Sequence, residues 1–217
     1  MPRGFQIGRL FGTDIFMSPT FLLLLAFYFL TSSREHLSTV AVFAVALILS
    51  LLVHEFGHVT AVRTLLRTDC WILLWAMGGL CIWKPTGDDS PRKRILIALA
   101  GPAFQVPLAL VFVFLWLYVT VPDKTLASRF IFFMFWINVV WLGVNLLPML
   151  PLDGGHALQA ALEYAVHPAR AETIAARVSA VTAVAAGAAA YHFGMFLATM
   201  LCVLFLIQNL ARARKQP

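Results

Sequence analysis

The residues best suited to chemistry lie in the run His54-Glu55-Phe56-Gly57-His58. On a helix, residues i and i+4 lie on one face, so the two imidazoles can reach a single metal ion. Glu55 lies beside them and can take a proton from an attacking water molecule. The spacing therefore predicts a metal-dependent hydrolytic centre carried by one helix.

The composition places this motif in a membrane. Of the 217 residues, 61% are hydrophobic and only 12% are Asp, Glu, Lys or Arg, and the mean hydropathy is +0.85. A typical soluble domain carries roughly 25% charged residues, and a chain of this size has no single core that could hide so much apolar surface. These values exclude an ordinary soluble enzyme, a disordered chain and a secreted disulfide scaffold, and they predict an integral membrane protein.

Uncharged runs long enough to cross a bilayer, about 20 residues each, predict six spans. Their approximate bounds are 15–33, 37–62, 95–122, 130–152, 173–191 and 193–211. The expected fold class is a mainly α polytopic membrane protein with about six transmembrane helices and a small membrane-associated β element. We expect the whole chain, 1–217, to form a single transmembrane domain.

The basic residues indicate how the spans are oriented. With six spans, 13 lysines and arginines fall on one side of the membrane, and only Arg34, Lys124 and Arg129 fall on the other. The positive-inside rule then places both termini in the cytoplasm. The net charge of +6 therefore reflects topology and contact with anionic lipid, and we expect no nucleic-acid partner.

The span topology narrows the search for a third metal ligand, which a catalytic zinc site needs besides one open position. Spans 37–62 and 130–152 both run toward the cytoplasmic side, and Asp153 follows the second at a depth similar to that of His54. Asp123 lies at the opposite face, and Asp88 and Asp89 lie in a solvated loop. A zinc motif that continues to a histidine at position 64 is excluded by Thr64.

Residues 70–83 are apolar but too short to span a bilayer, and Gly78-Gly79 interrupts them. Aromatic and β-branched residues around a glycine pair predict a β-hairpin near the membrane interface. Two interpretations stay open for this hairpin. It is either an interfacial anchor or an edge strand that pairs with an extended peptide, with Gly78 and Gly79 as substrate-binding residues.

Taken together, these motifs resemble the site-2 protease family of intramembrane zinc metalloproteases. The run HEFGH in an early span is joined to NLLPMLPLDGG at 145–155. The segment AGPAFQ at 100–105 and a strand-then-proline entry at 11–21 are similar to further parts of the family pattern. The resemblance covers nearly the whole chain. One departure is Gln105, where asparagine is commoner in the family.

The resemblance implies an intramembrane endopeptidase that cleaves within or near transmembrane segments, either in regulated proteolysis or in clearing signal peptides. It implies one catalytic Zn²⁺ bound by His54, His58 and Asp153, with Glu55 as general base and later acid. Asn145 would hydrogen-bond the scissile carbonyl or its oxyanion. The alternative for Asn145 is a structural cap on the broken helix.

The expected partners are transmembrane protein or peptide substrates and the lipid bilayer. The chain shows no segment for a PDZ or CBS domain, so we expect control by a separate regulatory protein or by loops. The expected location is the cytoplasmic membrane of a bacterium or archaeon.

Two other functions stay open. The same residues could form the transit site of a membrane metal transporter, or belong to an inactive relative that only binds membrane helices. A transporter needs polar groups on both sides of the midplane, and the outer halves of these spans offer almost none. The full set of two histidines, a glutamate and an aspartate speaks against an inactive relative.

Overall fold

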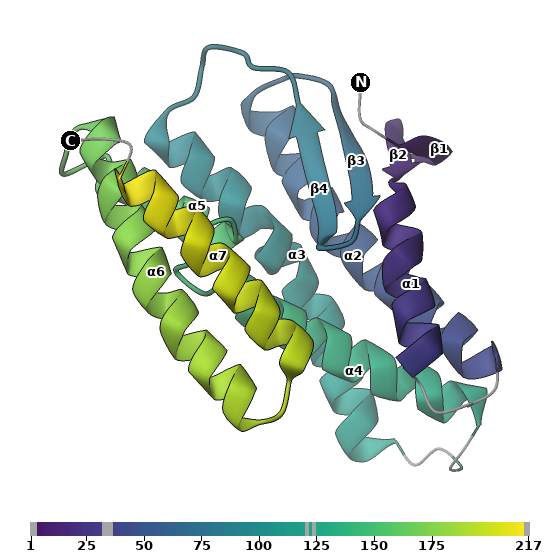
Figure 1. Cartoon of the computed structure of the whole chain (residues 1–217). Coiled ribbons are helices and arrows are strands. Elements are labelled where there is room, and N and C mark those ends of the chain that lie inside the picture. Colours follow the sequence, from purple (N-terminus) through teal and green to yellow (C-terminus); the bar gives the residue numbers. More distant parts are fainter. Residues whose placement is uncertain (1–3, 32–36, 120–121, 123–124, 215–217) are drawn as a thin grey trace. The chain divides into compact units, whose positions relative to one another are not determined.

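The structure of the protein is a computed structural model that describes residues 4–31, 37–119, 122 and 125–214. In chain order its elements are β1 (Phe5–Leu10), β2 (Thr13–Met17), α1 (Pro19–Thr31), α2 (Leu37–Leu65), β3 (Cys70–Trp75), β4 (Gly78–Trp83), α3 (Pro91–Tyr118), α4 (Leu126–Asn145), α5 (Asp153–Leu162), α6 (Pro168–His192) and α7 (Phe196–Arg214) (Figure 1). Four basic residues used for the predicted orientation lie outside the described residues: Arg3, Arg34, Lys124 and Lys215.

The predicted fold class, mainly α with a small β element, is confirmed. Within the described residues, five helices are long and apolar enough to cross a membrane, namely α2, α3, α4, α6 and α7. The first predicted span, 15–33, differs because β2 occupies its start and α1 has only 13 residues. Such a helix is about 20 Å long, which is shorter than the roughly 30 Å hydrocarbon layer. Pro19 sets this boundary, since proline suits the first turn of a helix.

The predicted span 130–152 is also shorter than expected. Helix α4 ends at Asn145, and the next helix begins at Asp153. Pro148 and Pro151 lie between them, and proline cannot donate the backbone hydrogen bond that would continue the helix. The segment between α4 and α5 is therefore a loop with turns rather than the end of a span.

The chain forms two compact units. The first comprises Met1–Asp88 and Ala103–Leu142, and the second comprises Asp89–Pro102 and Gly143–Pro217. The expectation of one transmembrane domain over the whole chain stays a prediction.

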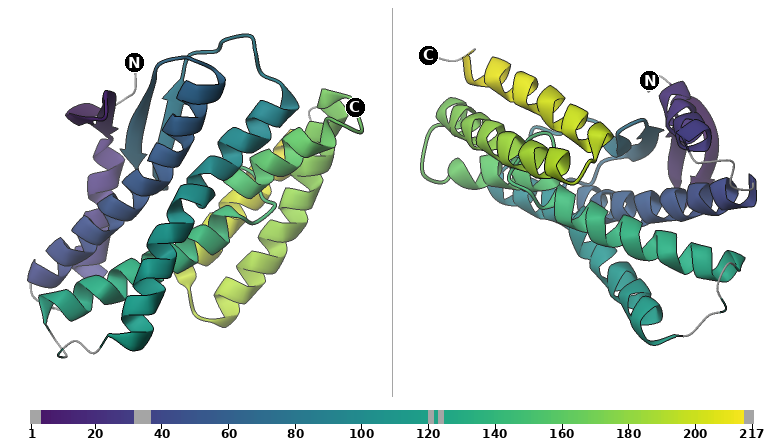
Figure 2. Two further views of the ribbon diagram at one scale, coloured as in Figure 1. Left: turned by 180° about the vertical axis from the view of Figure 1, so that it is seen from behind. Right: turned by 60° about the horizontal axis from the view of Figure 1, so that its bottom comes forward.

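The first unit contains a four-stranded sheet in the order β1-β2-β3-β4, in which only the β2–β3 pair is parallel. The predicted hairpin at 70–83 is confirmed as the antiparallel pair β3–β4. Cys70, Ile72 and Leu74 alternate along β3 and are buried. This alternation buries one face of the strand, and β3 and β4 lie along α2 (Figures 1 and 2).

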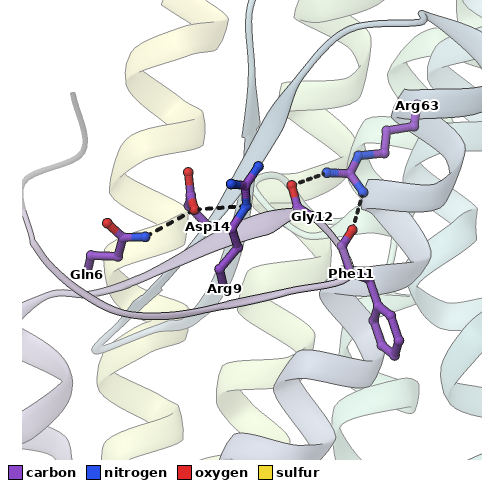
Figure 3. Close-up of polar contacts among 6 residues, drawn as sticks. All are labelled: Gln6, Arg9, Phe11, Gly12, Asp14 and Arg63. Atoms are coloured by element: carbon purple, nitrogen blue, oxygen red, sulfur yellow. Dashed lines mark hydrogen bonds and ion pairs between the residues drawn. The ribbon is translucent and has the colours of Figure 1, made fainter.

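An arginine ties the first hairpin to α2. Phe11 and Gly12 form a two-residue turn in which both have positive φ, 47° and 71°, as a type I′ turn requires. Arg63 donates hydrogen bonds to the carbonyl oxygens of Phe11 (2.7 Å) and Gly12 (2.8 Å) (Figure 3). The Phe11 ring also meets Phe56 edge-on at 5.6 Å. Figure 3 also shows the polar contacts along the hairpin, among Gln6, Arg9 and Asp14.

In the second unit, α6 and α7 lie side by side (Figures 1 and 2). The buried face of α6 consists of small residues: Ala171, Ala175, Ala176, Ser179, Ala180, Ala183 and Ala190. Small residues allow apolar helices to approach closely in a bilayer. A Cβ at Gly187 would lie 3.1 Å from Cβ of Cys202 on α7, so glycine at this position allows the two helices to lie close together. Helix α5 also packs on α6, and its C-cap residue Glu163 pairs with Arg94 of the same unit.

Candidate metal centre

Helix α2 carries the two histidines and the glutamate as the sequence predicts. His54, Glu55 and His58 are buried, with exposed fractions of 3%, 3% and 8%. The i, i+4 spacing brings the two imidazole rings within 4.9 Å, centroid to centroid. Their Nε2 atoms lie 3.2 Å apart. Three ionisable side chains are therefore gathered on one buried turn of α2.

The separation of the two Nε2 atoms tests whether the pair fits a metal ion. Zinc lies about 2.0–2.1 Å from an imidazole nitrogen and is tetrahedral, so two nitrogens on one ion are about 3.3 Å apart. The observed 3.2 Å meets this spacing without a change of either ring. Two imidazole nitrogens beside a carboxylate also form a donor set that zinc accepts. The histidine pair therefore fits zinc.

The Nδ1 atom of His54 faces an amide from another helix. Nδ1 lies 3.0 Å from Oε1 of Gln105 on α3, and Gln105 Nε2 donates to Asn138 Oδ1 on α4 at 3.2 Å. Asn138 Nδ2 donates in turn to Ser50 Oγ at 2.9 Å and to the Met134 carbonyl oxygen at 2.7 Å. Gln105, at which the sequence departs from the family pattern, is therefore a hydrogen-bond partner of His54.

Asn138 and Ser50 were not among the residues expected at the site. A signal for them exists in the sequence, because polar side chains inside apolar spans are costly and need partners. That signal does not say which partner each side chain has. Both residues are completely buried, as is Gln105.

The start of β4 packs directly on Glu55. A Cβ added at Gly79 would lie 2.4 Å from Glu55 Cγ and 2.5 Å from Oε1. At Gly78, which has φ of 125°, a Cβ would lie 2.5 Å from the ring of Trp141. The two glycines are therefore required by close approach, and the hairpin predicted from them lies beside the predicted general base.

The hairpin also holds two buried thiols, Cys70 and Cys81, which are free. A hydrogen bond from Cys81 lowers the pKa of Cys70 to about 7, and the Arg63 guanidinium contributes in the same direction. The same hydrogen bond and burial raise the pKa of Cys81. Cys70 therefore has the more acidic thiol of the pair.

In the second unit, the loop between α4 and α5 is held by polar side chains. The backbone N–H of Leu150 donates to Ser179 Oγ at 2.9 Å, and its carbonyl oxygen accepts from Asn209 Nδ2 at 2.7 Å. Thr182 Oγ1 donates to the Pro148 carbonyl oxygen at 3.4 Å. Both polar groups of the buried Leu150 backbone are thus satisfied, as burial requires.

The two glycines after Asp153 let α5 begin directly against this loop. A Cβ at Gly154 would lie 2.4 Å from the Leu146 carbonyl oxygen, and one at Gly155 would lie 2.4 Å from the Leu150 nitrogen. The loop thereby holds Asp153 at the first position of α5. Asn145 and Asp153 belong to this second unit. The role of Asp153 as a metal ligand and that of Asn145 as a hydrogen-bond donor to the substrate carbonyl remain predictions.

The chain is similar to known zinc metalloproteases. The model of peptidase family M50 matches residues 42–128 and 119–186. A zinc metalloprotease of Methanocaldococcus jannaschii is 25% identical over 181 residues, which cover 82% of this chain and 51% of the relative. A Synechocystis sp. protein whose name places it among zinc metalloproteases is 28% identical over 171 residues, 73% of this chain and 44% of the relative. The chain thus spans about half the length of these curated relatives.

A solved structure shares the fold. The site-2 protease from Methanocaldococcus jannaschii matches with a TM-score of 0.70 over 99% of this chain and 97% of that chain. The two sequences are 19% identical. The similarity covers the helices and the small sheet together, so this chain has the site-2 protease fold.

Proposed function

The chain belongs to peptidase family M50, and on that premise we propose that it is an intramembrane zinc endopeptidase of the site-2 type. Its substrates are membrane proteins cleaved within or near their transmembrane segments, in regulated proteolysis or in signal-peptide clearance. One observation carries the proposal: two imidazole Nε2 atoms converge to 3.2 Å on a buried helix turn, and Glu55 lies between them in the sequence.

His54, His58 and Asp153 hold one Zn²⁺ in this proposal, and the fourth position is left open. The spacing of the histidines supports two of these ligands. For Asp153, the support is the topology read from the sequence, in which the predicted spans 37–62 and 130–152 run toward the same side of the membrane. Asp153 is also the first residue of α5, behind a loop whose backbone is anchored within its own unit. A zinc ion held there lowers the pKa of water and polarises a carbonyl group.

Glu55 takes a proton from the attacking water as the water oxygen adds to the scissile carbonyl carbon. It then gives that proton to the amide nitrogen as the C–N bond breaks, which releases an amine and a carboxylic acid that keeps the second proton of the water. Burial of Glu55 keeps competing bulk water away from the carboxylate. The side-chain amide of Asn145 donates a hydrogen bond to the oxyanion that forms on the carbonyl oxygen.

The substrate needs an extended segment, because a helix hides its own peptide bonds in i to i−4 hydrogen bonds. Strand β4 lies at the edge of the described sheet, and its Gly78-Gly79 end is packed beside Glu55. An unwound segment that pairs with β4 would therefore bring its peptide bonds toward the glutamate. This is strand addition to an open sheet edge.

Proline substitutions test the strand addition. Successive residues of a strand direct their N–H groups to opposite sides, so one of Leu80 and Cys81 points its N–H at the open edge. Proline at that residue should raise KM for a transmembrane reporter and leave the thermal stability of the hairpin nearly unchanged. Proline at Ile7, in the other edge strand β1, is the matched control. If neither Leu80→Pro nor Cys81→Pro alters cleavage, β4 does not bind substrate.

The activity itself is tested with the full chain reconstituted in lipid nanodiscs. Wild type should bind one zinc per chain by elemental analysis and cleave a transmembrane reporter peptide. Glu55→Gln should keep the zinc and lose about 10²- to 10⁴-fold in kcat, the usual contribution of a general base. His54→Ala should lose the zinc. Cleavage that survives Glu55→Gln would overturn this mechanism, and zinc transport across vesicles without cleavage would favour a transporter.

We also propose that both termini face the cytoplasm. Basic residues lie in the last turns of α2 (Arg63) and α7 (Arg212 and Arg214), which the positive-inside rule assigns to the cytoplasmic side. A separate regulatory protein controls access of substrate in this proposal. Protease accessibility of a C-terminal tag in inverted and right-side-out vesicles tests the orientation.

A further inference from the structure

Three polar side chains from three helices form a continuous buried hydrogen-bond network that ends at His54. Ser50 comes from α2, Gln105 from α3 and Asn138 from α4, and each is completely inaccessible to solvent. Burying uncharged polar groups costs free energy unless their hydrogen bonds are satisfied. In this network the three side chains hydrogen-bond to one another. The end of the network away from His54 is a backbone carbonyl group of α4.

That backbone carbonyl determines the direction of the hydrogen bonds that lead from Asn138 through Gln105 to His54. The Met134 carbonyl oxygen can only accept, so the Asn138 atom 2.7 Å away must be its NH₂ group. Asn138 Oδ1 then faces Gln105 and must accept from Gln105 Nε2, 3.2 Å away. The side of the Gln105 amide that remains is its oxygen, which lies 3.0 Å from His54 Nδ1. An amide oxygen cannot donate, so Nδ1 carries the proton.

We propose that Gln105 and Asn138 are positioning residues that hold the proton of His54 on Nδ1, so that the lone pair of Nε2 is directed toward the metal. This inference rests on the proposed metal centre. A histidine that ligates through Nε2 needs its proton on the other nitrogen. The Met134 carbonyl belongs to a helix and cannot turn over as a side-chain amide can. The hydrogen-bond network therefore has one stable direction of donation.

The expected size of the effect follows from the loss of the acceptor. Removing the hydrogen-bond partner of a metal-ligating histidine typically lowers metal affinity or activity about 10- to 100-fold. Gln105→Leu has a similar volume and no acceptor, so it leaves the Nδ1–H buried without a partner. Gln105→Glu keeps an acceptor for that N–H and should recover most of the zinc affinity. Asn138→Leu acts one step further away and should have a smaller effect.

A control must separate this role from general stability. Thr13 is also completely buried in the first unit, and its hydroxyl has no hydrogen-bond partner within the described residues. Thr13→Val therefore removes a buried polar atom and leaves the hydrogen-bond network of Ser50, Gln105 and Asn138 unchanged. Val62→Ala, at a fully buried position one turn beyond His58 on α2, supplies a variant that is destabilised by a cavity.

The first measurement uses the metal-free full chain, labelled with ¹⁵N-histidine, in detergent micelles at a pH where His54 is neutral. The ¹⁵N shifts, assigned with His54→Gln, should show the proton on Nδ1 in wild type and a mixture of both tautomers in Gln105→Leu. The second measurement is zinc affinity by chelator competition, together with the visible spectrum of the Co²⁺-substituted protein. Gln105→Leu should bind zinc 10- to 100-fold more weakly and shift the Co²⁺ bands, and both controls should match wild type.

The outcomes are distinct. A proton on Nε2 in wild type, or unchanged tautomer and zinc affinity in Gln105→Leu, would overturn the positioning role. Equal losses of affinity in Gln105→Leu and Val62→Ala would also overturn it, because stability alone would then explain the effect. A wild-type chain with the proton on Nδ1 that binds no zinc would support the hydrogen-bond direction and refute the proposed metal centre.

Discussion

Gly79→Ala tests whether the hairpin determines the position of Glu55. Gly79 does not have a positive φ, so the backbone of β4 accepts alanine at this position. The added methyl group, however, would lie 2.4 Å from Glu55 Cγ and 2.7 Å from Cδ. The substitution therefore acts on the glutamate side chain and leaves both histidines untouched.

The size of the displacement follows from contact distances. Two carbon atoms pack at about 3.5–4.0 Å, so Glu55 and the hairpin must separate by about 1 Å or more. A misplacement of about 1 Å in a catalytic group can cost on the order of 10²-fold in rate, which corresponds to about 2.7 kcal/mol in activation free energy. We therefore expect kcat to fall about 100-fold and zinc content to stay at the wild-type level.

The assay is single-turnover cleavage of a transmembrane reporter peptide in nanodiscs, with zinc measured on the same samples. Gly8→Ala is the matched control, because it makes the same substitution in the same sheet and meets no atom within 4 Å. Gly8→Ala should keep wild-type kcat and zinc content. Thermal unfolding of both variants shows whether the sheet itself has been weakened.

Two results would refute the reasoning. If Gly79→Ala retains wild-type kcat, then either Glu55 is not the general base or β4 does not lie against it in the active protein. If Gly79→Ala loses its zinc, the substitution perturbs the histidines, and the contact with Glu55 does not explain the effect. A tenfold or greater loss in Gly8→Ala would show that the sheet tolerates no alanine at all.

Three further outcomes can be measured directly. The ultraviolet absorbance of the Cys70 thiolate, measured in a Cys202→Ala background, should reach half its maximum near pH 7, because the hydrogen bond from Cys81 lowers the pKa of Cys70 to about 7. Cys81→Ala removes that hydrogen bond and should move this midpoint to higher pH. Asn209→Leu removes the donor to the buried Leu150 carbonyl oxygen and should lower the free energy of unfolding by about 1–3 kcal/mol, measured by denaturation in mixed micelles. Removing zinc with a chelator should abolish cleavage, and added Zn²⁺ should restore it.

The local parts of the fold and site could be predicted from the sequence. The i, i+4 spacing places His54 and His58 on one helix face, because helix geometry relates residues a single turn apart. The hairpin at 70–83 follows from a glycine pair between two apolar runs, which is again a local signal. Both features appear in the structure where the sequence predicts them.

The first span shows where the local signals fail. Residues 15–33 form one apolar run, and hydropathy does not distinguish a strand from a helix within such a run. Strand β2 takes the start of this run because it pairs with β1 on one side and β3 on the other. Strand β3 lies more than 50 residues further along the chain, since Ile15 pairs with Ile72. Such pairing depends on the tertiary fold.

The sequence by itself determined which residues can do chemistry and that they lie in a membrane, because side-chain type, helical spacing and hydropathy are properties of the chain. The tertiary structure alone decided which atoms of those residues face one another. Gln105 is 51 residues from His54, and Asn138 is 33 residues beyond Gln105. A buried amide bonds to whatever polar group the packing of three helices brings within about 3 Å, and no local pattern in the sequence records that choice.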